Sequence, residues 1–567
     1  MLSAMRCQSP IRLWGYCCVS LLIFSISASM REPVFAVQQA GRSRPDQDPN
    51  IACASCHRAI YESYRTTPMA NASGWASDGV IPADFQHEPS GVHYRIYAEN
   101  DKVWLSYERL ASGHAAALSG KQQLIYFLGS GRRGRTYLFE QQSYWFEAPI
   151  NWYSKKHIWD MTPNYLSAQE MPLTLPVDPG CLVCHASGAS SSLTDARNHY
   201  AAAPFASGGI TCAACHGDGS AHAASSGKTK LIDIDALDPV RRDSVCLSCH
   251  LEGQVAVTRF GKRPEDFHPG DNLFDYTVFF VHKDESGSGG RATSQWEALL
   301  RSKCKQASGN RMTCTTCHAP HSSPTPDQRV AFYRQKCLQC HNQPGFAAGH
   351  HAENSDCTAC HMSRAPTNDI AHEQLTDHWI VRRIDTKQPP AVKSGELVTV
   401  GDKPVSSRDL GLAYAQMAAG GDREAGNRAR ILLLRAAQSP DATRDSELFA
   451  QLGFLEQIDS NLSEAAKDYQ HALVIDPNQS LAEGNLALID AVQHHLKEAE
   501  QHWQAVFTRD PVQIGAGLNL AVVQCQSGER VAAEQTLHRI LVFAPDNQRA
   551  HAMQTAIETG KQPCTGR

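Results

Sequence analysis

The sequence CTTCHAPH, at residues 314–321, begins with the pattern Cys-x-x-Cys-His. The same pentapeptide pattern occurs seven times before residue 362, whereas a chain with 20 Cys and 26 His among 567 residues should contain far less than one copy by chance. The copies are CASCH at 53–57, CLVCH at 181–185, CAACH at 212–216, CLSCH at 246–250, CTTCH at 314–318, CLQCH at 337–341 and CTACH at 357–361. This repetition dominates the chemistry of the first two thirds of the chain.

Each copy has the spacing that attaches c-type haem. Two thiols three positions apart can each bond one vinyl group of a porphyrin, and the next imidazole reaches the iron as its proximal ligand. We therefore predict seven covalently bound haems c. The expected thioether residues are Cys53, Cys56, Cys181, Cys184, Cys212, Cys215, Cys246, Cys249, Cys314, Cys317, Cys337, Cys340, Cys357 and Cys360. The expected proximal ligands are His57, His185, His216, His250, His318, His341 and His361.

Two other uses of paired cysteines explain the pattern less well. Zinc sites use Cys pairs, but they do not require His directly after every pair. A disulfide between residues three positions apart would close a tiny loop and gain little stability.

The first 36 residues have the features of a secretory signal peptide. Arg6 and Arg12 precede an apolar run at 21–28, and residues 34–36 read VFA, with small or aliphatic residues where a signal peptidase cuts. The alternative is a retained membrane anchor, but the apolar stretch is shorter than the roughly 18 residues that span a bilayer. We expect a soluble, exported protein, located in the periplasm or an equivalent compartment.

The composition is that of a multi-domain globular protein. Charged residues make up 20% of the chain and the formal net charge is −5, so nucleic acid is not expected as a partner. Six of the seven motifs lie between residues 181 and 361. Haem must supply much of the apolar surface there, and we expect short helices and loops with sparse regular structure.

Between the first two motifs the sequence changes to strand-like alternation. Residues 93–109 read HYRIYAENDKVWLSYER, which predicts a hairpin, and residues 123–149 continue the pattern. We expect a small antiparallel β insertion at about 85–155. It contains Gly-x-Gly-x-x-Gly at 129–134, but the strand-like RTYLFE follows, so a glycine-rich turn explains the glycines better than a dinucleotide site.

From residue 446 the sequence repeats every 34 residues, with Pro477, Pro511 and Pro545 closing the units. This period and its small and large positions resemble the tetratricopeptide repeat, a pair of antiparallel helices. Residues 408–440 resemble a degenerate preceding repeat. Such arrays present a concave face to a protein or peptide, and Gln451, Asn485 and Asn519 occupy matching positions on the first helices. The alternative is a purely structural appendage.

The predicted organisation is a signal peptide at 1–36, a multihaem cytochrome c domain at 37–385, a linker at 386–407 and repeats at 408–560. The linker is placed at a Pro- and Gly-containing stretch. The expected fold class is mainly α: a haem-packed domain with sparse helices and a small β insertion, followed by an α-solenoid of helix pairs.

Function depends on the sixth ligands of the irons. Thirteen histidines lie outside both the motifs and the repeats, enough to saturate every iron. The candidates in recognisable settings are His222 in CHGDGSAH, His321 in CHAPH, and His372 and His378 in HEQLTDHWI. His321 is three residues from His318 and cannot bind the same iron, since two axial imidazoles approach from opposite faces of the porphyrin. The only option for His321 is the iron of a neighbouring haem.

These segments, CHGDGSAH, CTTCHAPH and CTACHMSR with HEQLTDHWI, resemble the multihaem cytochromes related to the tetrahaem electron acceptor of hydroxylamine oxidoreductase. The resemblance covers about residues 50–385. It implies bis-His haems in closely stacked pairs, a periplasmic location and electron transfer. Where such proteins often place a His after the first motif, this chain has TTPMA, so Met69 is a candidate distal ligand, or else an ordinary packed residue.

Three functions remain open. The first is an electron carrier whose repeats dock a protein partner, with redox partner proteins or a membrane-associated electron-transfer complex at either end of the route. The second is a multihaem oxidoreductase that acts on a small nitrogen or sulfur compound at a five-coordinate haem. All seven motifs end in His rather than the Lys that commonly marks pentahaem nitrite reductases, which favours the carrier. The third is a scaffold whose repeats carry the function.

Overall fold

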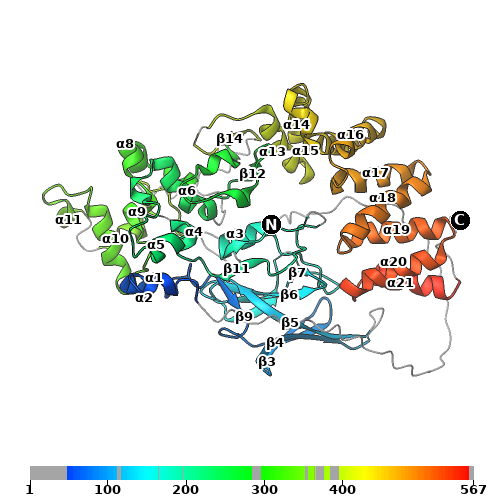
Figure 1. The fold of residues 1–567 in the computed structure, drawn as a ribbon, viewed down its shortest axis with the longest axis horizontal. Helices are drawn as coiled ribbons and strands as arrows, with labels where there is room; N and C mark the ends of the chain where they lie inside the picture. The colour runs from blue at the N-terminus through cyan, green and yellow to red at the C-terminus, as the bar shows by residue number, and fades with distance from the viewer. Residues whose placement is uncertain are drawn as a thin grey trace.

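The computed structural model describes residues 48–111, 117–163, 165–193, 196–283, 295–350, 355–362, 364, 376–382, 395–401 and 403–560. The expected signal peptide, His372 and much of the expected linker lie outside these residues. Three parts are visible in Figure 1: a large antiparallel sheet, a lobe of short helices that carries the motifs, and an arc of longer helices at the C-terminal end. None of the described helices combines the length and hydropathy needed to cross a membrane.

The large sheet has nine antiparallel strands. They are β1 Ser73–Trp75, β2 Ala83–His87, β3 Val92–Glu99, β4 Lys102–Arg109, β5 Leu118–Leu128, β6 Gly134–Gln141, β7 Tyr144–Glu147, β8 Ile150–Tyr153 and β9 Ile158–Met161. The order is β2-β3-β4-β5-β6-β8-β9, with β1 paired to β5 and β7 to β6. Alternate residues point into the core, as Val92, Tyr94 and Ile96 do on β3, because successive side chains of a strand face opposite sides.

This sheet corrects two expectations. The β insertion was expected at about 85–155 and as a small element, whereas the sheet runs from residue 73 to residue 161. The N-terminal part is therefore mainly strands rather than a mainly α, sparse-helix domain. The reason is that β1 and β9 have only three and four residues, too short for an alternating pattern to be read from sequence.

The motif-bearing lobe is built from short helices, as expected. They are α1 Ile51–Ala54, α2 Arg58–Tyr64, α3 Pro179–His185, α4 Ala213–His216, α5 Ser220–Ala224, α6 Pro239–His250, α7 Gln295–Leu300, α8 Lys303–Ser308, α9 Cys314–Cys317, α10 Arg329–Leu338, α11 Phe346–Gly349 and α12 Cys357–His361. Two small antiparallel sheets accompany them, β10 Ala186–Ala189 with β11 Phe205–Gly208, and β12 Val255–Thr258 with β13 Thr277–His282 and β14 Leu397–Thr399.

The C-terminal helices form antiparallel pairs. They are α13 Ser407–Ala419, α14 Arg423–Ala436, α15 Ser446–Ile458, α16 Leu462–Ile475, α17 Ser480–Val492, α18 Leu496–Arg509, α19 Ile514–Gln526, α20 Arg530–Phe543 and α21 Gln548–Glu558. From α15 to α20, corresponding helices begin 34 residues apart, which is the period in the sequence. Small buried residues at the helix crossings, such as Ala465, Ala499 and Ala533, let the helices approach closely.

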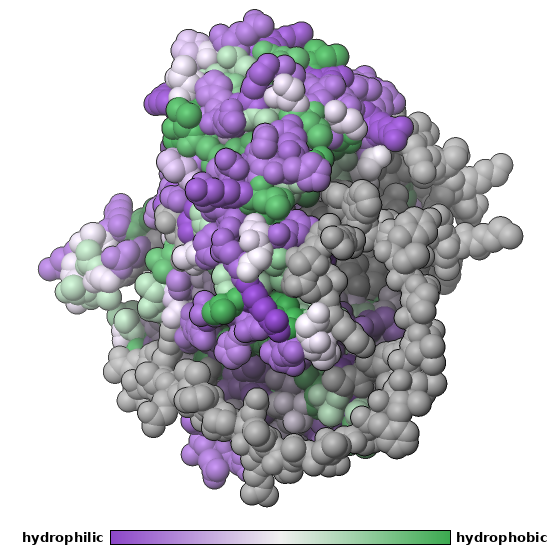
Figure 2. All heavy atoms as spheres, turned by 90° about the vertical axis from the view of Figure 1, so that its right-hand side faces the viewer, coloured by the Kyte–Doolittle hydropathy of each residue, from purple (hydrophilic) through white to green (hydrophobic). Residues whose placement is uncertain are grey.

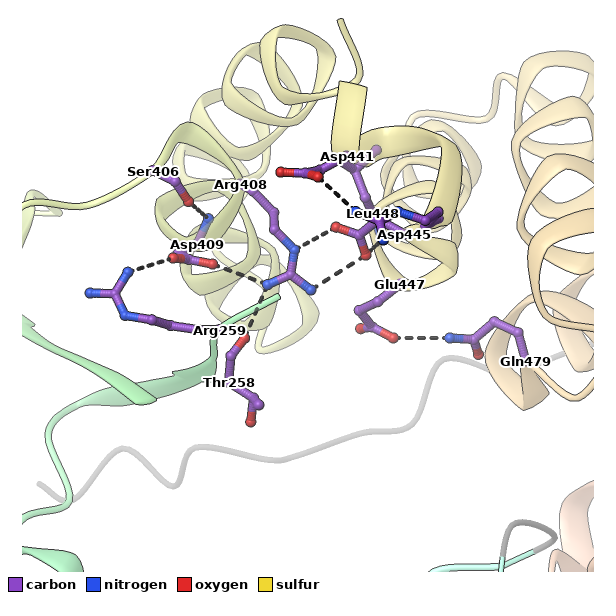
Figure 3. A network of polar contacts seen from close by, with 11 residues as sticks. Thr258, Arg259, Ser406, Arg408, Asp409, Asp441, Asp445, Glu447, Leu448 and Gln479 are labelled. Carbon is purple, nitrogen blue, oxygen red and sulfur yellow. Dashed lines mark hydrogen bonds and ion pairs between the residues drawn. The ribbon is translucent and has the colours of Figure 1, made fainter. Parts of the chain in front are cut away.

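The helical array is joined to the rest of the protein at its first pair. β14, which lies within the expected linker, pairs with β13, and Leu397 and Phe280 belong to the same buried cluster as Tyr414 of α13. Figure 3 shows the polar network here: Arg408 bonds Asp445 and the carbonyl of Thr258, and Arg259 contacts the buried Asp409. Residues 395–401 therefore do not separate the two halves as a free spacer.

The last helices contact the large sheet. Phe543 is buried in the sheet's core cluster, Gln141 donates to the carbonyl of Val542 (2.7 Å), and Tyr144 donates to the carbonyl of Arg509 (3.1 Å). The array is thus held at both ends. On the side of the array shown in Figure 2, the coloured residues are mostly hydrophilic, with hydrophobic ones scattered among them.

Candidate haem-attachment sites

Each described motif forms one turn of helix. The backbone N–H of the histidine donates to the carbonyl of the first cysteine, for example from His57 to Cys53 (2.8 Å) and from His318 to Cys314 (3.0 Å). This turn brings the two thiols to one face, because residues three apart are neighbours on a helix surface. The backbone turn thus places the two cysteines of each pentapeptide on the same side, as attachment to one porphyrin would require.

Local sequence explains where these turns begin. Asp178, Asp238 and Asp356 cap α3, α6 and α12 by accepting backbone N–H groups of the first turn. Thr313 caps α9, where Thr316 completes a capping box. Side-chain oxygens of this kind satisfy N–H groups that have no partner within the helix, so even these short helices have defined starts.

The motifs form one connected series through their thiols. The thiols of Cys184 and Cys249 interact, as do those of Cys314 and Cys246, which joins the second and fifth motifs to the fourth. The thiols of Cys53 and Cys212 interact in the same way, as do those of Cys337 and Cys357. Electrostatic interactions between Cys215 and Cys249, and between Cys317 and Cys340, complete the series. Its order is first, third, fourth, fifth, sixth, seventh, and the second motif branches from the fourth.

Four proximal histidines face a second imidazole at nearly constant spacing. The ring centroids are 6.3 Å apart for His57 and His222, 6.0 Å for His216 and His321, 6.1 Å for His318 and His378, and 6.0 Å for His361 and His350. The planes of each pair differ by 15° to 29°.

This spacing fits a metal ion between the two rings. A metal–imidazole bond is about 2 Å long and the ring centroid lies about 1 Å behind the nitrogen, so two axial imidazoles should have centroids about 6 Å apart. Direct stacking of aromatic rings would need no such constant value, since stacked and tilted pairs range from about 4.5 to 7 Å. Each of the four pairs therefore has the spacing that would hold one metal ion between its two rings.

Hydrogen bonds at ring nitrogen Nδ1 orient three of these histidines and leave Nε2 for a metal ion. Nδ1 of His222 lies 2.7 Å from the carbonyl of Thr229, Nδ1 of His361 2.7 Å from that of Val381, and Nδ1 of His378 3.0 Å from that of Thr376. A carbonyl can only accept, so Nδ1 carries the proton and Nε2 keeps its lone pair for a metal.

The surroundings of the pairs favour neutral imidazole, the form that binds iron. Desolvation lowers the pKa of His216, and the neighbouring His321 and His57 lower it further. Desolvation also lowers the pKa of His378, with a smaller contribution from His250. Both shifts disfavour the protonated ring, which has no lone pair to donate.

The structure places the candidate distal ligands as follows. His222, His321 and His378 each face the proximal histidine of another motif, and His321 faces His216 rather than its neighbour His318. For the first motif the facing ring is that of His222. Met69 lies in a turn after α2, where its carbonyl accepts from Ile210 (3.0 Å).

Sequence reasoning missed His350. It lies just beyond α11, between the sixth and seventh motifs, and Phe346 stacks on both His350 (4.9 Å) and His341 (5.3 Å). No short pattern such as CHAPH marks it; only its position between two closely spaced motifs could have drawn attention to it. Among the described residues, no second imidazole lies at about 6 Å from His250 or His341.

The polar residues expected on the concave face of the repeats are partly engaged within the array. Gln451 donates to Glu447 one turn earlier (2.9 Å), and Asn485 donates to the hydroxyl of Tyr469 (3.1 Å). All three, Asn519 included, are half-buried. A partner at this face would meet side chains that already have local hydrogen bonds.

Residues 307–345 match the family described as Doubled CXXCH motif. This match covers the fifth and sixth motifs and supports covalently bound c-type haem. No curated protein matches the chain.

Several solved structures are similar to part of this chain. A structure of MamA AMB-1 is 17% identical over 27% of this chain and 81% of that chain, with a TM-score of 0.24. A tetratricopeptide repeat protein from Parabacteroides merdae is 19% identical over 27% of this chain and 61% of that chain, with a TM-score of 0.25. YrrB, described as a TPR protein with an unusual peptide-binding site, is 21% identical over 26% and 74%, with a TM-score of 0.22.

Proposed function

We propose that the protein is an exported heptahaem c-type cytochrome that transfers electrons through mostly bis-His haems. The observation that carries the proposal is the set of four histidine pairs whose ring centroids are 6.0–6.3 Å apart. These pairs occur within one connected series of Cys-x-x-Cys-His turns. Bound haem c supplies one-electron redox chemistry at potentials set by its ligands and surroundings.

In this proposal the protein's residues fix the order of the cofactors. The thiols would hold each group covalently. The pairing of His57 with His222 ties the first motif to the segment after the third, and the pairing of His216 with His321 ties the third motif to the segment after the fifth. Because each of these pairs takes its two rings from different segments of the chain, cofactor binding and folding of the lobe should be coupled. Two saturated axial positions leave an iron no site for substrate, which favours a carrier.

Two features support export. The predicted signal peptide is the first, and the second is Cys525, which is disulfide-bonded. Disulfides persist in oxidising compartments and are rare in the cytosol. Periplasmic location and a partner protein at the repeat array remain parts of the proposal.

Electron paramagnetic resonance of the fully oxidised protein tests the carrier against the oxidoreductase. A carrier with saturated irons should give low-spin ferric signals for the four motifs whose histidines are paired. A strong high-spin signal that responds to an added small nitrogen or sulfur compound would instead favour catalysis at an open iron, for which the motifs of His250 and His341 are the first candidates.

A further inference from the structure

Positive charge is concentrated around the fifth and sixth motifs. Residues 301–350 contain seven Lys and Arg residues and one Asp, and we call this segment the basic lobe. Residues 446–560, in the repeats, contain six Lys and Arg residues and fifteen Asp and Glu residues. The helices α8 to α10 of the basic lobe and the repeats lie at opposite ends of the molecule (Figure 1).

Three cations of the basic lobe are directed at solvent. Lys303 begins α8, Arg311 ends the 3-10 turn Gly309–Arg311, and Arg329 begins α10, and all three are exposed. None of them forms an ion pair with a described residue. Their charge is therefore available to a partner rather than neutralised within the protein.

Two of these cations lie close in the sequence to haem-attachment residues. Arg311 is three residues before Cys314, and Arg329 is on the helix that carries Cys337. A protein that binds the basic lobe would therefore lie close to the fifth and sixth motifs.

We propose that the basic lobe is the docking surface for an acidic redox partner protein. This inference rests on the proposed electron-transfer function and names the kind of partner and the place where it binds. Unpaired surface charge raises the rate of encounter with an oppositely charged protein and orients it, and the acidic repeats would repel the same partner. An anionic membrane surface would also be attracted by positive charge, but it would not need the cations to lie on the segments that carry the fifth and sixth motifs.

The test compares two triple variants with the same change in charge. The basic-lobe variant is Lys303→Glu, Arg311→Glu and Arg329→Glu. The control variant is Arg423→Glu, Lys497→Glu and Arg549→Glu, three exposed cations of the helical array without ion pairs to described residues. Every control substitution, and those at Lys303 and Arg329, lies in the first turn of a helix, where a negative charge is favourable, so both variants should fold.

The probe is reduced flavodoxin, an acidic low-potential electron-transfer protein, mixed with the oxidised holoprotein in stopped flow. For wild type, the second-order rate constant should fall as salt is added. It should be about tenfold lower in the basic-lobe variant at low salt and within about twofold of wild type in the control variant. Reduction by a photoreduced neutral flavin should be the same in all three proteins.

Equal flavodoxin rates in the two variants would overturn the docking proposal. Binding of wild type but not of the basic-lobe variant to phosphatidylglycerol vesicles, with unchanged flavodoxin rates, would overturn it in favour of a membrane surface. If the neutral flavin reduces none of the proteins, the electron-transfer function itself fails.

Discussion

Arg109 and Asp546 form a bidentate ion pair between the end of β4 and the turn after α20, with N–O distances of 2.5 and 2.9 Å. Both side chains are only 4% exposed, and Asp546 also accepts the backbone N–H of Met171 (2.7 Å). This contact joins residues 437 positions apart in the sequence. Together with the buried cluster at α13, it makes the repeats a part of one folded structure.

Replacing Arg109 with Met should reduce the free energy of unfolding by about 3–5 kcal/mol, because Asp546 would remain buried without a countercharge. The double variant Arg109→Met, Asp546→Leu should lose much less than the sum of the two single variants. Urea unfolding of the holoproteins measures both quantities. Strictly additive losses would mean that the two side chains do not interact.

His222→Ala should remove the imidazole opposite His57 and convert one low-spin iron to high spin. Met69→Ala should leave the spectrum unchanged, since His222 is the ring that faces His57. Electron paramagnetic resonance of the two ferric variants distinguishes them. The opposite result, a high-spin signal in Met69→Ala alone, would show that the thioether of Met69, and not His222, is the ligand opposite His57.

His350→Ala should produce one new high-spin iron in the same way, since His350 faces His361 at 6.0 Å. Phe346→Leu is the matched control, because it alters the ring stacked on His350 but supplies no ligand. A redox titration should show one midpoint moved in His350→Ala and the others in place. An unchanged spectrum would show that another histidine completes the seventh site.

The sequence was sufficient for the motifs and for the period of the repeats, because both depend on spacing along the chain. His321 could also be assigned to a neighbouring motif. It is only three residues from His318 and therefore cannot reach the opposite face of the haem that His318 would bind. The size of the sheet could not be predicted, because β1 is only three residues long. Neither could the contact of Arg109 with Asp546 or the place of β14 beside β13, since such long-range pairings leave no periodic signal.

Asp468 should make stability depend on pH. Burial, followed by repulsion from Glu456 and Glu464, raises the pKa of its carboxyl from 3.8 to about 6. The folded protein then binds this proton more tightly than the unfolded chain, so the site's contribution to stability is greatest at low pH and is lost as the pH rises through about 6.

Asp468→Asn removes this dependence, because the amide does not ionise. The variant should have a higher melting temperature than wild type at about pH 7.5, and the difference should vanish near pH 4. Thermal unfolding across this range checks the sign. A difference that does not change with pH would mean that Asp468 ionises normally.

The central claim is that all seven Cys-x-x-Cys-His turns carry covalent haem. Mass spectrometry of the exported, denatured protein tests it most directly, because thioether bonds survive denaturation while free haem is lost. The account predicts a mass increase of seven haems on one chain. Five or fewer would contradict it.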